Sequence, residues 1–169
     1  REFFPDEPLS CRTRNDHGTH VASTAGGNHA YGCGSTILPG KASMSGMAPR
    51  ARLAIYKAMW ERRGTLVDVM SAVEDAVLDG VDVINLSFEP HFVENPADDP
   101  VQLALKNAAG AGVFVAAAAG NRGPSFGSTV NNVPWVTQIA ASTHHRKDTS
   151  DQVVVLLGDG QKITGVGYS

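Results

Sequence analysis

The sequence predicts an α/β fold built around a mostly parallel sheet. Residues 81–88 form a short apolar run rich in β-branched residues, which is typical of a buried parallel strand, and residues 113–121, "VFVAAAAGN", predict another strand. Helical patterns at 66–80 and 98–112 precede and separate them, so strands and helices alternate along the chain. This alternation favours right-handed crossovers and therefore a parallel sheet. The 169 residues, 42% of them hydrophobic, suffice for one globular domain with a sizeable core.

The first predicted element is a helix that begins near His17. Small side chains follow Asn15 and Asp16, and either of these two residues can cap a helix start. Gly26 and Gly27 follow the small residues and are expected to end the helix.

A long loop and a strand are expected next. Residues 28–50 are rich in glycine, serine and proline and therefore predict a loop. Residues 52–59, "RLAIYKAM", alternate between apolar and polar positions, which predicts a strand.

The helices and strands of the second half have clearer boundaries. The helix over 66–80 has an apolar face of Leu66, Met70, Val73 and Val77 and is expected to end at Gly80. In the next helix, Pro100 lies just inside the start, and Gly110 and Gly112 lie near the end. A further strand is expected at 134–142, and residues 152–168 predict a hairpin that turns at Gly158-Asp159-Gly160.

Composition and charge exclude several classes of protein. The net charge is −3 and basic residues form no run, which argues against a nucleic-acid partner. No apolar run reaches 18 residues, so no membrane span is expected. Residues 1–10 have no initiator Met and no apolar core of signal-peptide length, so we expect the sequence to start partway through a longer protein. Cys11 and Cys33 are expected to be free thiols, with a bridge between them as the alternative.

The predicted sheet indicates where a functional site should lie. Ligands of parallel sheets bind beyond the carboxyl ends of the strands, which here are Ser87-Phe88-Glu89 and Gly120-Asn121. His17, at a helix start, can keep one ring nitrogen free for a substrate and so act as a general base. A capping histidine and a simple turn asparagine are the structural alternatives for His17 and Asn121.

Four segments resemble the motifs of subtilisin-like serine proteases, in the order of that family. They are "DHGTHVAST" (16–24), "GMAPRARLAIYKAMW" (46–60), "DGVDVINLSF" (79–88) and "VAAAAGNRGPS" (115–125). Three further stretches, "AGNRGPS", "PWVTQIAAST" and "LGDGQKITGVGYS", resemble the plant, cucumisin-like branch. The resemblance implies an incomplete, three-layer, doubly wound α/β fold. Residues 1–169 would form the central part of a peptidase domain, and 158–169 would approach an inserted domain.

The resemblance also implies a role for each candidate residue. His17 would be the general base, and His20 an inward-facing structural residue. Asn121 would donate its side-chain amide to the oxyanion. Ala118 and Ala119 would form part of a pocket wall, and Gly120 would let the substrate come close. Ser87, Phe88 and Glu89 would pair with the substrate as an extra strand.

The sequence departs from the family pattern in three places. Glu89-Pro90 stands where two glycines are usual, so either the groove is altered, with a preference for a basic residue near Glu89, or activity is impaired, or the change is tolerated. No apolar strand ending in Asp precedes His17, and neither Asp6 nor Asp16 suits the role. The family's nucleophile motif is also missing, because Ser43 lies in a loop before Pro49 rather than at a helix start.

The sequence therefore predicts a serine endopeptidase that cleaves polypeptides by a Ser-His-Asp triad, of which this chain carries the base but neither Asp nor Ser. Alone it should be inactive, and the remainder of its own catalytic domain is an expected partner. Secretion to the apoplast or vacuole is implied by the resemblance, and no cofactor or metal is expected. A metal site on His17 and His20 would lack further ligands. The alternative function is a non-catalytic binding or inhibitory protein on a protease-derived fold.

Overall fold

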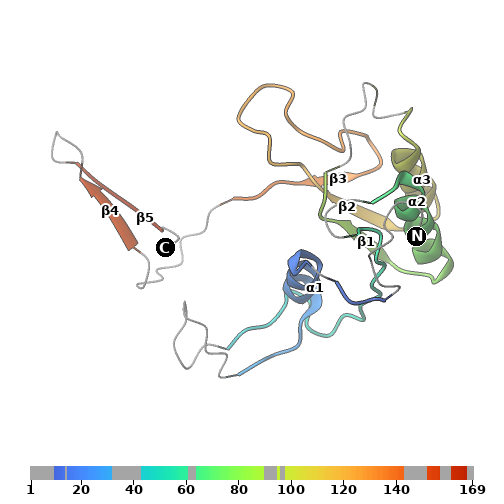
Figure 1. Ribbon diagram of the computed structural model, residues 1–169, viewed down its shortest axis with the longest axis horizontal. Helices are drawn as coiled ribbons and strands as arrows, with labels where there is room; N and C mark the ends of the chain where they lie inside the picture. The colour runs from blue at the N-terminus through green and yellow to red at the C-terminus, as the bar shows by residue number, and fades with distance from the viewer. Residues whose placement is uncertain are drawn as a thin grey trace. The chain divides into compact units, whose positions relative to one another are not determined.

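The computed structural model describes residues 10–13, 15–31, 43–60, 64–89, 95, 98–142, 152–156 and 161–166. The chain divides into two compact units, residues 1–22 with 52–141 and residues 23–51 with 142–169. Figure 1 shows the elements in chain order: α1 (His17–Gly26), α2 (Leu66–Leu78), β1 (Val83–Leu86), α3 (Pro100–Gly110), β2 (Phe114–Ala118), β3 (Thr137–Ile139), β4 (Gln152–Leu156) and β5 (Lys162–Val166).

The first unit contains the predicted parallel sheet. Its strands lie in the order β1-β2-β3, and both neighbouring pairs are parallel. Leu86 pairs with Ala117 across the first two strands, and Ala118 pairs with Ile139 across the second pair. The predicted strands at 81–88, 113–121 and 134–142 are therefore confirmed, with shorter ladders than their apolar runs.

One face of this sheet carries the hydrophobic core. α2 and α3 pack against each other beside the strands (Figure 1), and alternate residues of β1 and β2 are buried. On the opposite face Val83, Phe114 and Ile139 are 57%, 54% and 55% exposed. Because parallel sheets normally bury both faces, this is an incomplete α/β fold. The buried cluster comprises Ala58, Val69, Val73, Ala76, Ile84, Leu86, Val101, Ala104, Leu105, Ala108, Val113, Val115 and Ala117.

Helix α2 begins at a capping box that the sequence analysis did not single out. The Thr65 hydroxyl accepts the N–H of Asp68, and the Asp68 carboxylate accepts the N–H of Thr65. Burial alone would raise the pKa of Asp68, but hydrogen bonds from Thr65 and Trp60 lower it overall. The predicted apolar face was partly wrong, because Leu66 is exposed and the buried positions are Val69, Val73 and Ala76.

Helix α3 begins at Pro100 and ends at Gly110, close to the predicted boundaries. Asp99 caps its start, accepting the N–H of Val101 at 2.7 Å, and Pro100 occupies the first turn, where no N–H is needed. Leu105 in the middle of the helix is completely buried. The chain leaves the helix through Gly112, whose φ of +94° favours glycine.

The prediction of a strand at 52–59 was wrong. These residues form no ladder in the described structure, and the apolar side chains of Leu53 and Ile55 are exposed. Side chains hold the end of the segment instead: Tyr56 donates its hydroxyl to Asp79 Oδ2 at 2.6 Å, and Ala58 is buried in the core. The hydrogen bond to Asp79, with burial and the nearby negative charges, raises the pKa of Tyr56 to about 12.

The second unit contains a loop and a hairpin. The described parts of 28–50 form no helix and only one isolated bridge, between Ala30 and Met44, as the loop prediction expected. Strands β4 and β5 pair antiparallel, with Leu156 opposite Lys162, which confirms the two hairpin strands. The predicted turn at Gly158-Asp159-Gly160 lies outside the described residues.

Candidate functional site

His17 is the first residue of α1, as predicted. Its backbone N–H donates to Asn15 Oδ1 at 2.8 Å, so Asn15 supplies the expected capping contact. The imidazole is exposed at the helix start. Lys57 anchors the chain that leads into this helix, because its ammonium donates to the carbonyl oxygens of Ser10 at 3.2 Å and Arg12 at 2.8 Å.

His20 is exposed, so the expectation that it faces inward was wrong. The start of α1 presents a largely solvated surface, since residues 16–20 are all exposed. Among the described residues, no group of three or more His, Cys, Asp or Glu side chains is placed to hold a metal ion. Cys11 is an exposed free thiol, and Cys33 lies outside the described residues.

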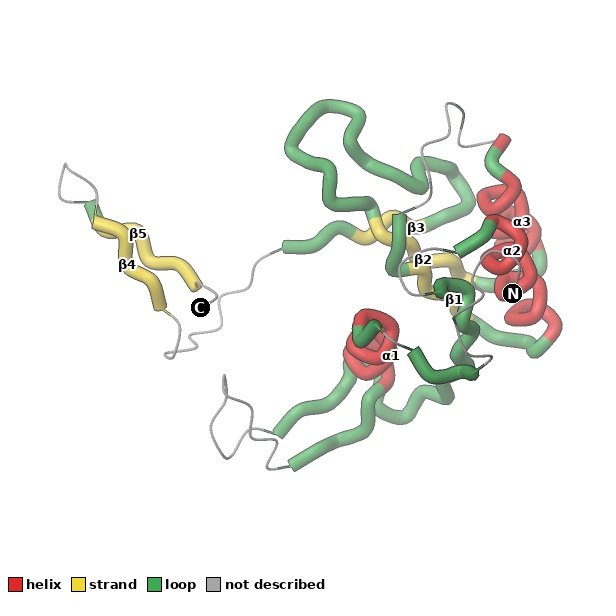
Figure 2. Tube along the Cα trace, viewed as in Figure 1, coloured by secondary structure: helices red, strands yellow, loops and turns green. Residues whose placement is uncertain are grey.

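Gly120 and Asn121 lie in the turn that follows β2. Figure 2 shows the long loop that joins β2 to β3. Gly120 has a φ of +92°, a conformation that glycine adopts without strain. The Asn121 side chain is exposed, and within the described residues its amide makes no hydrogen bond. A donor amide thus stands beyond the carboxyl end of a parallel strand, where such sheets bind ligands.

Hydrogen bonds fix the backbone of Ala118 and Ala119, just before this turn. Ala119 donates its N–H to the Ile139 carbonyl and accepts the N–H of Val130, both at 2.9 Å. The Ala118 carbonyl accepts the side-chain amide of Asn131 at 2.9 Å. Ala118 is half-buried and Ala119 is buried, so their backbone is fixed while the turn itself is exposed.

The end of β1 supplies three further predicted residues. Ser87 accepts the Asn85 side-chain amide at 3.0 Å, and Phe88 packs against the hydrophobic core. Glu89 reaches across to the neighbouring turn: its Oε1 accepts the N–H of Asn121 at 2.7 Å, and its Oε2 accepts Arg122 Nε at 3.0 Å. Pro90 lies outside the described residues.

The structure therefore brings Glu89, Gly120 and Asn121 together and adds Arg122, which the sequence analysis missed. The hydrogen bond from Asn121, followed by that from Arg122, holds the pKa of Glu89 below its ordinary value. In the described part of the chain, no hydrogen bond or ion pair joins His17 to this cluster. The structure thus places the base and the oxyanion candidates on separate elements.

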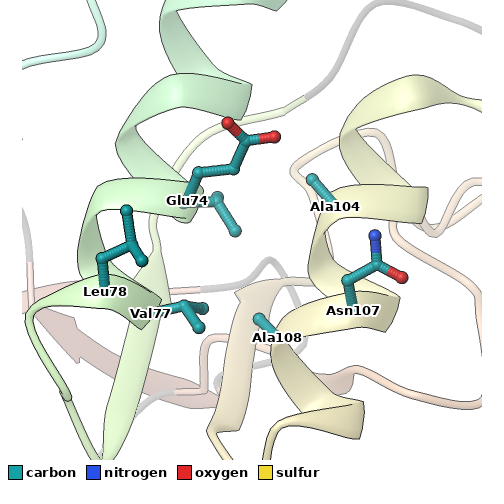
Figure 3. A pocket seen from close by; sticks show the side chains of 7 residues that line it. Glu74, Val77, Leu78, Ala104, Asn107 and Ala108 are labelled. Carbon is teal, nitrogen blue, oxygen red and sulfur yellow. The ribbon is translucent and has the colours of Figure 1, made fainter.

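A groove elsewhere in the unit does not belong to this cluster. It lies between α2 and α3, has a volume of about 320 Å³, and carries Glu74 and Leu78 on one side and Ala104 and Asn107 on the other (Figure 3). None of the predicted site residues lines it. Among the described residues, no helix combines the length and hydropathy needed to cross a bilayer.

Comparison with known proteins defines the class of the chain. It is 41% identical over 170 residues to subtilisin-like protease SBT1.6 of Arabidopsis thaliana, and 44% identical over 168 residues to subtilisin-like protease SBT2.4 of the same plant. These matches cover 95% of this chain but only 21% and 19% of the two relatives, so the chain spans about a fifth of their length. Among solved structures, sphericase matches with a TM-score of 0.58 at 27% identity, covering 94% of this chain and 46% of that one.

A second solved structure, the S41 psychrophilic protease, matches with a TM-score of 0.60 at 26% identity and the same coverage. The family model Peptidase_S8, described as the subtilase family, matches residues 4–154. The chain therefore belongs to the subtilase family, and the expected family and the incomplete subtilisin-like α/β fold are confirmed.

Proposed function

We propose that this chain is the central part of a serine endopeptidase that hydrolyses polypeptides by a Ser-His-Asp triad. His17 is its general base and Asn121 its oxyanion donor. The observation that carries the proposal is the exposed Asn121 amide beyond β2, on a turn that Gly120 opens with a φ of +92°. Membership of the subtilase family and the names of its relatives as proteases support the same reaction.

The proposed mechanism uses groups from this chain and from the rest of the protein. The imidazole of His17 takes the proton of the catalytic serine while the serine oxygen bonds to the substrate carbonyl carbon. Asn121 Nδ2–H donates to the oxygen that becomes negative, which is worth roughly 10²–10³ in rate. His17 then gives its proton to the leaving amine, and water hydrolyses the acyl-enzyme by the same base.

Substrate would lie along the end of β1 and the turn after β2. Ser87, Phe88 and Glu89 follow β1, and Ala119 and Gly120 follow Ala118 at the end of β2. A peptide laid along these two strand ends would extend the sheet. Because Phe88 packs into the core, its backbone rather than its ring would contact the peptide.

We propose that the aspartate and the serine come from outside this sequence, from the remainder of the catalytic domain, which is the proposed partner. The uncovered face of the sheet supports this, because Val83, Phe114 and Ile139 are exposed where a parallel sheet is normally covered. Secretion, to the apoplast or the vacuole, is proposed from the plant relatives.

The test uses the full-length protein that contains this chain and a serine-directed phosphonate. We expect the wild type to react covalently and His17→Ala to abolish the reaction, because the serine then has no base. His29→Ala, which removes another exposed histidine of the described structure, is the matched control and should react normally. Full reactivity of His17→Ala would refute the assignment, and an unreactive wild type would favour the non-catalytic binding protein.

A further inference from the structure

The Glu89 side chain reaches from the end of β1 to the turn after β2. The parallel register favours this contact, because Leu86 pairs with Ala117 at the end of the ladder, and Glu89 and Gly120 each follow three residues later in the chain. A Cβ added at Gly120 would lie 3.3 Å from Glu89 Oε1, which shows how closely the carboxylate approaches the turn. The family resemblance implies glycine at this position, where this chain has glutamate.

Both carboxylate oxygens are used. Oε1 accepts the backbone N–H of Asn121 at 2.7 Å, and Oε2 accepts Arg122 Nε at 3.0 Å. Charge-assisted hydrogen bonds of this kind are about twice as strong as neutral ones. The pairing also compensates the charge of Glu89 with the guanidinium of Arg122, so a basic substrate side chain would meet an ion pair rather than a free carboxylate.

The hydrogen bond to Asn121 fixes the plane of the peptide that joins Gly120 to Asn121. This matters because the glycine has wide conformational freedom and because the Asn121 amide makes no hydrogen bond within the described residues. The direction of the Asn121 side chain is therefore set from its backbone. Glu89 is the side chain that holds that backbone.

We propose that Glu89, tethered by Arg122, is a positioning residue that holds the turn of Asn121 so that its amide points to the oxyanion. This inference rests on the proposed function and deepens it. It assigns to the departure from the family's glycine pattern a role in catalysis rather than in selecting a basic substrate residue.

The test is steady-state kinetics of the full-length protein on a peptide substrate. We expect Glu89→Ala to lower kcat about ten- to a hundred-fold with KM changed less than about two-fold, because the misplaced donor matters most in the transition state. Glu89→Gln should recover most of kcat, since its amide oxygen can still accept the Asn121 N–H. Glu74→Ala removes an exposed glutamate from α2 and is the matched control.

A double variant separates positioning from general damage. In an Asn121→Ala background Glu89→Ala should lower kcat no further, because no donor remains to be positioned. A further loss there would assign Glu89 a merely structural role, and unchanged kcat with raised KM for basic substrates would assign it to specificity. Either result overturns the inference. If Asn121→Ala and His17→Ala both leave kcat unchanged, the proposed function itself fails.

Discussion

Replacing Gly120 by alanine tests the geometry of the site directly. At φ +92° an L-residue is strained, at a cost of about 1–2 kcal/mol. The new Cβ would lie 3.0 Å from Val130 Cγ2 and 3.3 Å from Glu89 Oε1, so both neighbours must shift by a few tenths of an ångström. Crowding of this kind adds about 1 kcal/mol at a partly exposed position. We therefore expect Gly120→Ala to lower the free energy of unfolding by about 2–3 kcal/mol.

Gly127→Ala is the matched control in the same loop. Gly127 has a φ of +71°, but a Cβ there would meet no heavy atom within 4 Å. Gly127→Ala should therefore lower the free energy of unfolding only by the cost of the strained backbone, about 1–2 kcal/mol. Denaturant unfolding of the full-length protein, together with kcat on a peptide substrate, measures both effects.

The values of kcat for the two variants test whether Gly120 positions the site. Gly120→Ala displaces the Glu89 carboxylate and should lower kcat at least about ten-fold, because the Asn121 amide is no longer held. Gly127→Ala should retain the wild-type kcat. Equal losses of stability in the two variants, with kcat unchanged in both, would refute the argument that Gly120 is required by its neighbours.

Two further predictions concern the support of the site and its sheet. Asn131→Ala leaves the buried Gln102 amide without its 2.7 Å acceptor and the Ala118 carbonyl without its donor, so denaturant unfolding should show a loss of about 2–4 kcal/mol. Tyr56→Phe removes the hydrogen bond to Asp79. Since the folded pKa of Tyr56 is raised from 10 to about 12, this stabilisation should be complete below pH 10 and disappear as the pH rises to 12. The unfolding free energies of wild type and Tyr56→Phe should therefore converge over that range, and a constant difference would contradict the assignment.

The elements that the sequence predicted well have local signals that agree with their tertiary contacts. In α3, Asp99 and Pro100 set the start and Gly112 the end, and the buried face follows from the same stretch. In β1 and β2, short apolar runs flanked by turn residues predict buried strands, regardless of which other elements pack against them. Nothing non-local is needed to place these elements.

The segment at 52–59 shows where local pattern fails. Alternation identifies residues that could sit in a sheet, but a strand also needs a partner for its backbone, and in the described structure this segment has none. His20 fails for a related reason. Whether a helical side chain is buried depends on which other elements cover the helix, and the spacing of residues within α1 does not reveal this.

Glu89 and Arg122 are 33 residues apart, and no motif joins them. The signal that could have found the pair is the strand register. With Leu86 opposite Ala117, Glu89 and Gly120 each follow three residues later, so the segments that leave the two strands start side by side. A carboxylate there must either be hydrated, which requires an open groove, or be satisfied by donors of the adjacent turn. The N–H of Asn121 and the guanidinium of Arg122 supply those donors within 3.0 Å. Glutamate in place of glycine is therefore compatible with the site, because the turn that carries the proposed oxyanion donor also supplies the groups that neutralise the charge of the glutamate.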